Sequence, residues 1–276
     1  MPILMLTVMA LIQGVTEFLP ISSSAHLVLT RAAWGGLGLG AAQPDPAAEL
    51  LMDVALHVGT LFAVALYFRK DVAALVVGGI ALLRGRRDGP AHLAWLVLVA
   101  TVPAFLAGGL LKELITTDLR GLEVIAWTTL IFGVALGVAD RMPTNRMASD
   151  LTWKGALVIG AAQSLALIPG VSRSGIAITT ARWLGLARDE AARFALLLAL
   201  PTIAGAGALA AVDVGQSDGG YTLEADALIG ALLAFFAAYG AIHLMMRWLK
   251  SANFLPFVVY RIALGLVLLW LTYGVA

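Results

Sequence analysis

The chain has 276 residues, of which 61% are hydrophobic and 13% are charged, and its formal net charge is +1. Soluble domains carry about 25% charged residues, so this composition indicates an integral membrane protein. The chain has no basic arm interleaved with aromatic residues, which excludes a nucleic-acid partner. It also has no cysteine, which excludes disulfides, thiolate metal sites and a cysteine nucleophile.

The first apolar stretch, residues 3–30, is interrupted by polar residues where a membrane helix should continue. Pro20 ends one helix, and three serines and His26 follow it directly. A spanning helix needs about 20 mostly apolar residues, and each half of this stretch is too short. Ionisable groups in hydrocarbon are costly and therefore indicate a functional site. The stretch predicts a re-entrant helix–turn–helix hairpin, whose irregular backbone must be buried in protein or line a wet cavity.

Six later segments are long and apolar enough to span a membrane: 50–68, 92–111, 122–139, 191–212, 227–246 and 255–273. Between the third and the fourth lies a second broken stretch, 153–183, interrupted by Pro169-Gly170 and by the run Ser172-Arg173-Ser174-Gly175. We expect this stretch to form a second re-entrant hairpin for the same reason as the first.

The loop charges predict an orientation. Lysine and arginine gather after the first, third and fifth spans, whereas the connection 213–226 has acidic residues and neither base. By the positive-inside rule the first group is cytoplasmic, and the acidic connection and both termini are external.

The two broken stretches superpose without a gap at a constant offset. Gln13 falls on Gln163 and Ser22 on Ser172. Each stretch is followed by three spans, so the second half starts from the opposite side of the membrane. This arithmetic predicts an inverted-topology repeat with halves of about 1–140 and 151–276 and a site at their interface. The expected fold is an all-α polytopic membrane protein, a single domain of six transmembrane helices and two re-entrant hairpins.

The first hairpin carries groups suited to proton transfer. Gln13 and Glu17 are four residues apart and share a helix face, and Ser22 is a natural N-cap for the next helix. His26 lies one turn beyond Ser22 and Ser23, so a carboxylate, a hydroxyl and an imidazole are expected to converge at the turn. Such a set performs acid–base work or activates a nucleophile. The alternative is a polar cap without catalysis.

The second hairpin carries groups suited to an anion. Ser172, Arg173 and Ser174 begin a short helix, whose N-terminus favours negative charge. Arg173 adds a planar fork suited to phosphate oxygens, and the alternative is a purely structural ion pair with Glu17. Of the other polar residues, His57 lies within the first span and is expected to be a core histidine, with a position facing the site as the alternative. Arg261 is expected to extend towards the cytoplasmic surface.

Two stretches also resemble those of a known family: Gln13-Gly-Val-Thr-Glu17-Phe-Leu-Pro20-Ile-Ser-Ser-Ser-Ala-His26 and Pro169-Gly-Val-Ser-Arg-Ser174-Gly. They are similar to the signature motifs of the undecaprenyl-diphosphate phosphatases of the bacitracin-resistance family. The resemblance extends over the whole chain, including 194–201 and 256–261.

The resemblance implies a membrane hydrolase that removes the terminal phosphate of undecaprenyl diphosphate and so recycles the lipid carrier of cell-wall precursors. It implies a divalent cation, Mg²⁺ or Ca²⁺, with Glu17 as the candidate metal ligand, in a bacterial plasma membrane with the site facing outwards. The expected catalytic residues are Glu17, Ser23, His26 and Arg173, and the expected substrate-binding residues are Gln13, Ser22, Ser24, Gly170, Ser172 and Ser174.

Several alternatives stay open at this point. The nucleophile is Ser23, His26 or water, and Ala177 stands where the family usually has a threonine, for which Thr179 or Thr180 would have to substitute. Inverted repeats with broken helices are also typical of transporters, so a polyprenyl-phosphate flippase is the second functional hypothesis and a lipid-binding module the third. The expected partners are the polyprenyl diphosphate and membrane lipid, and a homodimer is left open.

Overall fold

The regular secondary structure is helical in the part of the chain that the structure, a computed structural model, describes: residues 2–36, 46–86, 89–117, 119, 121–143, 146–215 and 225–274. No β-strand occurs in these ranges. The helices are α1 (Ile3–Phe18), α2 (Ser23–Gly36), α3 (Pro46–Tyr67), α4 (Arg69–Leu83), α5 (Pro90–Thr117), α6 (Leu122–Asp140), α7 (Trp153–Ser164), α8 (Arg173–Trp183), α9 (Arg188–Gly215), α10 (Ala225–Leu249) and α11 (Leu255–Tyr273).

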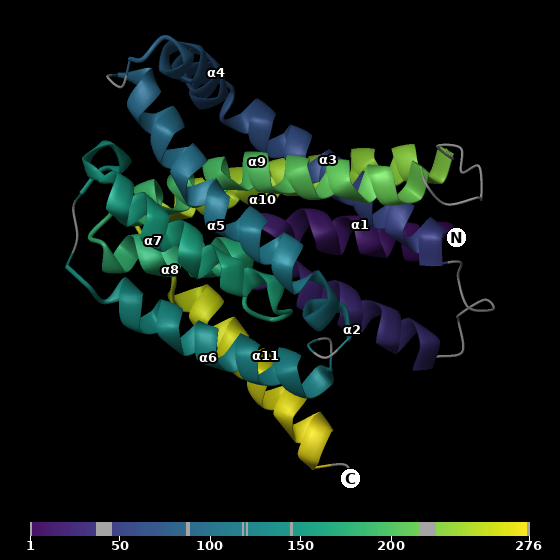
Figure 1. The fold of residues 1–276 in the computed structure, drawn as a ribbon. Helices are drawn as coiled ribbons and strands as arrows, with labels where there is room; N and C mark the ends of the chain where they lie inside the picture. The colour runs from purple at the N-terminus through teal and green to yellow at the C-terminus, as the bar shows by residue number, and fades with distance from the viewer. Residues whose placement is uncertain are drawn as a thin grey trace.

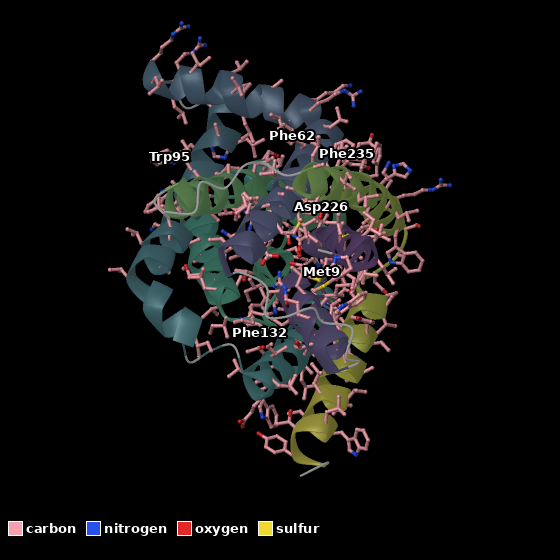
Figure 2. The ribbon with its side chains drawn as sticks, turned by 90° about the vertical axis from the view of Figure 1, so that its right-hand side faces the viewer. Met9, Phe62, Trp95, Phe132, Asp226 and Phe235 are labelled. Carbon is pink, nitrogen blue, oxygen red and sulfur yellow. The ribbon has the colours of Figure 1, made fainter. Side chains whose placement is uncertain are left out.

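The six predicted spans are confirmed. Among the described residues, six helices are long and apolar enough to cross a membrane: α3, α5, α6, α9, α10 and α11. Their outer surfaces are apolar, as lipid contact requires. Phe62 of α3 is 63% exposed, whereas Met9 of α1 is 2% exposed and lies near the middle of the bundle in Figure 2. The chain is therefore a multi-pass membrane protein.

One helix was not expected. The stretch after the first span, read from the sequence as a basic loop, forms α4. It was missed because its 15 residues are too few for a membrane span. The glycine pair Gly78-Gly79 also lowers the helix propensity of the stretch. Gly78 is nevertheless buried, because its missing side chain lets α4 approach the backbone of Pro90 at the start of α5.

Each broken stretch forms a pair of short helices joined by a turn. In Figure 1 the α1–α2 pair lies on the right and the α7–α8 pair on the left. A short 3₁₀ segment, Leu165–Leu167, follows α7 before the turn. The helix–turn–helix form agrees with the expected hairpins, and their re-entrant position in a bilayer stays a prediction.

The packing is crosswise between the proposed halves. The first short helix of one half, α1, packs on α10 of the other, and α7 packs on α5. The first spans of the two halves, α3 and α9, pack together, as do the third spans, α6 and α11. Contacts of this kind between the two halves are expected for a repeat whose site lies at the interface. They support the division into halves 1–140 and 151–276, which stays a prediction.

Several span ends meet at one end of the bundle. Asp140, at the end of α6, accepts from Arg188 at the start of α9 (2.6 Å) and from the backbone N–H of Phe254 just before α11 (3.0 Å). Arg193 of α9 pairs with Asp71 near the start of α4. These contacts agree with spans that alternate in direction. Residues 216–224 of the acidic connection lie outside the described residues, and the side of the membrane stays a prediction.

Arg261 corrects an expectation. It does not extend to the cytoplasmic surface but is 0% exposed within α11. Its guanidinium donates to the carbonyl oxygen of Pro20 in the first turn (3.2 Å) and to those of Gly170 (2.8 Å) and Val171 (3.0 Å) in the second. Carbonyl groups in a turn lack helical partners, and inside a membrane protein they need donors from elsewhere. Arg261 thus holds the two turns together.

We expect Arg261→Met to lower stability strongly, because several buried carbonyl groups lose their donor and each such loss costs about 1–3 kcal/mol. Thermal unfolding of the purified protein in detergent measures this as a fall in Tm. Arg69→Met, at an exposed position on α4, is the matched control and should change Tm little. Equal Tm values for the two variants would contradict the bridging role.

Candidate active site

The site begins at two turns that share an unusual backbone. Ser22 has φ 74° and Ser172 has φ 73°, the left-handed region that non-glycine residues rarely adopt. They occupy matching positions in the two broken stretches, each directly before a helix. Each hydroxyl also lies close to that of the serine two residues on, at 3.2 Å for Ser24 and 3.3 Å for Ser174. Such strain persists only where surrounding structure enforces it, and it clusters at functional sites.

The turns bring opposite charges together. Arg173 Nη2 donates to Glu17 Oε1 at 2.7 Å, so the ion pair that the sequence offered as the alternative role of Arg173 is present. The side chains are 19% and 6% exposed, and burial makes each charge dependent on the other. Arg173 Nη1 also donates to Thr202 Oγ1 (2.8 Å) and to the carbonyl oxygen of Ala199 (3.2 Å), both on α9.

The second oxygen of Glu17 serves the first turn. Ser23 Oγ donates to Glu17 Oε2 at 2.6 Å, and Gln13 Nε2 donates to the same oxygen at 3.0 Å. A serine hydroxyl at this distance from a carboxylate has a base in place to accept its proton. Glu17, Ser23 and Arg173 therefore form one connected cluster, as expected from the sequence.

His26 does not join this cluster. Its Nδ1 lies 2.7 Å from the carbonyl oxygen of Ser22, which can only accept, so Nδ1 carries the proton. Its Nε2 lies 2.5 Å from the hydroxyl of Tyr260 on α11, and the two rings stack. The expected convergence of the imidazole with Glu17 is wrong, because residues one turn apart let the ring bond back to the Ser22 carbonyl.

A different histidine faces the carboxylate. His57 of α3 has Nε2 3.9 Å from Glu17 Oε2, and its Nδ1 lies 2.7 Å from the carbonyl oxygen of Asp53. It lines the cavity described next. The sequence offered a weak signal for it, a histidine inside a span. Of its two interpretations, the structure favours the one in which His57 faces the site over the one as a core residue.

A cavity of about 360 Å³ opens beside the cluster. One part of its wall is polar and includes Glu17, Ser22, Ser23, Ser24, Ser172 and Arg173. Another part is apolar and includes Phe105 of α5 and Ile203, Ala206 and Leu209 of α9. Phe105 and Leu209 are 43% and 64% exposed, so the apolar wall continues to the outer surface of the bundle. The cavity can therefore hold a molecule with a charged head and an apolar tail.

Four of the expected site residues do not line this cavity: Gln13, His26, Gly170 and Ser174. Gly170 has φ +93°, and a Cβ there would collide with the Thr128 hydroxyl, so this glycine is required by the turn itself. Ser174 Oγ donates to the carbonyl oxygen of Leu19 at 3.0 Å and so ties the second turn to the first. Their expected roles in binding stay predictions.

The missing threonine is not replaced from the same helix. Ala177 is 1% exposed in the core, and the hydroxyls of Thr179 and Thr180 donate to carbonyl oxygens of their own helix. Thr202 of α9, which the sequence analysis missed in the middle of a span, lines the cavity and contacts Arg173 instead.

The described residues do not form a metal site of their own. Within them, no group of three or more His, Asp or Glu side chains has a metal-binding arrangement. Hard cations need several oxygen ligands, and both oxygens of Glu17 already accept from Arg173, Ser23 and Gln13. The side chains present therefore do not fit a protein-held Mg²⁺ or Ca²⁺.

Comparison with known proteins identifies similar chains. A model of the family described as "Bacitracin resistance protein BacA" matches residues 6–267. A protein of Hahella chejuensis named "Undecaprenyl-diphosphatase" is 47% identical over 269 residues, covering 96% of this chain and 97% of its own. A protein of Dinoroseobacter shibae with the same name is 48% identical over 274 residues, covering 98% of each chain. An "Undecaprenyl-diphosphatase 1" of Rhodospirillum rubrum is 46% identical over 282 residues, covering 99% of this chain and 96% of its own.

We expect Ser22→Gly to raise stability by up to about 1 kcal/mol, because glycine adopts a positive φ without the steric cost that serine bears. The rise in Tm in detergent measures this gain. Ser24→Gly, two residues on and inside α2, is the matched control and should lower stability by about 0.5 kcal/mol. A fall of similar size in both variants would mean that Ser22 is not strained.

Proposed function

The chain belongs to the BacA family of bacitracin resistance proteins, and we propose that it hydrolyses undecaprenyl diphosphate to undecaprenyl phosphate and inorganic phosphate. It is thus an enzyme, a phosphoric anhydride hydrolase that recycles the lipid carrier for peptidoglycan synthesis. The observation that carries the proposal is the Glu17–Arg173–Ser23 cluster, which lines a cavity that also has an apolar wall.

The substrate fits the two kinds of wall. The diphosphate lies against Arg173 and the serines of both turns, and the first isoprene units lie against Phe105, Ile203 and Leu209. Arg173 suits this role because a guanidinium carries five N–H donors, more than its contacts with Glu17, Thr202 and Ala199 use.

The chemical step uses the contact between Ser23 and Glu17. Ser23 Oγ attacks the terminal phosphorus while its proton passes to Glu17 Oε2, and the bond from that phosphorus to the bridging oxygen breaks. Undecaprenyl phosphate leaves, and water then attacks the phosphoserine to release phosphate and restore the hydroxyl. Arg173 stabilises the charge on the transferred group, the main form of catalysis in phosphoryl transfer. Direct attack by water, with Glu17 as base, is the alternative.

The two histidines take different parts. His57 lines the cavity with Nε2 3.9 Å from Glu17 Oε2, where this nitrogen can accept the proton that Glu17 takes from Ser23. His26 holds the carbonyl oxygen of Ser22 and so keeps Ser23 in position next to Glu17. His26 is thus a positioning residue, and the imidazole that faces Glu17 is that of His57 on α3.

The cation implied by the family resemblance is proposed to arrive on the diphosphate. Glu17 alone does not make a site for it, and no step above depends on it. The plasma membrane, and a site open to the external side, are proposed from the distribution of basic residues in the sequence. A homodimer is left open.

Purified protein in detergent is expected to release phosphate from undecaprenyl diphosphate. Detergent removes the two sides of the membrane, so a flippase without hydrolase activity releases none. Arg173→Lys should lower kcat/KM by about 10²-fold or more, because a point charge replaces a fork that holds both Glu17 and phosphate. Phosphate release that is absent from the wild type, or unchanged in Arg173→Lys, would overturn the proposed function or the proposed site, respectively.

A phosphoserine at Ser23 is expected during turnover. Substrate labelled in its terminal phosphate should transfer the label to protein after rapid acid quenching, and mass spectrometry should locate it on Ser23. Ser23→Ala should form no labelled protein and should lose at least about 10³-fold in kcat, as removal of a nucleophile does. An active Ser23→Ala enzyme would instead indicate direct attack by water.

A further inference from the structure

Gln163 is a buried polar side chain that the mechanism above does not use. It lies in the last turn of α7 and is 2% exposed, yet it lines the cavity beside Arg173. Neither its Nε2 nor its Oε1 has a hydrogen-bond partner among the described residues. Buried amides normally find partners, because an unpaired donor or acceptor destabilises the folded protein.

The matching residue in the first half shows what is different. Gln13 donates through Nε2 to Glu17 Oε2, four residues further on (3.0 Å). At the same offset from Gln163 the chain has Leu167, which offers no acceptor. The second half therefore keeps the amide but lacks the carboxylate that would occupy it, and the amide faces the cavity instead.

We propose that Gln163 binds the substrate, its Nε2–H groups donating to an oxygen of the diphosphate. This inference rests on the proposed function. A neutral amide supplies a donor to the anion without adding a second buried charge, which would itself need a partner. A hydrogen bond to an ionised phosphate is also stronger than one between neutral groups. Arg173 then neutralises the charge of the diphosphate, and the hydrogen bond from Gln163 orients it.

The test compares the same substitution at the two matching positions. Gln163→Leu should raise KM for undecaprenyl diphosphate about tenfold, because a hydrogen bond to a charged group is lost. It should also weaken inhibition by methylenediphosphonate, a diphosphate that cannot be hydrolysed, by a similar factor. Its Tm without substrate should stay equal or rise, because two unpaired polar atoms leave the interior.

Gln13→Leu should behave differently. It removes a donor from Glu17, so both Tm and kcat should fall. Ser164→Ala, next to Gln163 but outside the cavity wall, is the neutral control and should leave KM and inhibition unchanged. A Tm that falls in Gln13→Leu but not in Gln163→Leu would separate a binding amide from a structural one.

Two outcomes would overturn the inference. One is a Gln163→Leu enzyme with unchanged KM and unchanged inhibition. The other is a fall in Tm like that of Gln13→Leu, which would make Gln163 structural. Each outcome is measured while the wild-type protein still releases phosphate, so neither contradicts the proposed function. Failure of the proposed function shows separately, as wild-type protein that releases no phosphate.

Discussion

The structure depends on one side chain that satisfies the backbone of two turns at once. Turns inside a membrane protein expose carbonyl oxygens that neither a helix nor lipid can satisfy. Arg261 donates to Pro20 of the first turn and to Gly170 and Val171 of the second. Because its donors are held in a rigid plane, they set the separation of the turns, and the contact from Ser174 to the Leu19 carbonyl follows. The positions of Glu17, at the end of α1 before the first turn, and of Arg173, at the start of α8 after the second, are a consequence.

The charges of the site depend on that arrangement. A buried carboxylate or guanidinium without a partner destabilises a protein strongly. Glu17 comes from α1 and Arg173 from α8, so neither broken stretch can bury its own charge, and the pair forms only when both are assembled. The positive φ of Ser22 and of Ser172 belongs to the same arrangement, since each turn must change direction directly before a helix. Strain and charge are thus placed where the proposed chemistry occurs.

The cavity combines two environments that a lipid diphosphate requires. Among the described residues, its polar wall has one carboxylate, of Glu17, and one guanidinium, of Arg173, beside several hydroxyls and the amide of Gln163. Its apolar wall, from α5 and α9, reaches the lipid-facing surface through Phe105 and Leu209. Few charges and many neutral donors suit a site inside a membrane, where each additional charge would need a partner of its own.

The amino-acid sequence alone determined the six spans and where the two broken stretches are interrupted, although it did not indicate α4. The six spans follow from the length of the apolar runs, and the breaks follow from Pro20 and Pro169-Gly170. Both can be read locally because the backbone groups of a membrane helix form hydrogen bonds within that helix. The pairing of Glu17 with Arg173 was also predictable, since each buried charge needs a partner and the sequence offered few. Only the tertiary structure decided that His26 turns to Tyr260 while His57 faces Glu17, that Arg261 is buried, and that the Gln163 amide finds no hydrogen-bond partner among the described residues. These outcomes depend on which helices pack together, and the direction of a side chain across such an interface has no local pattern in the sequence.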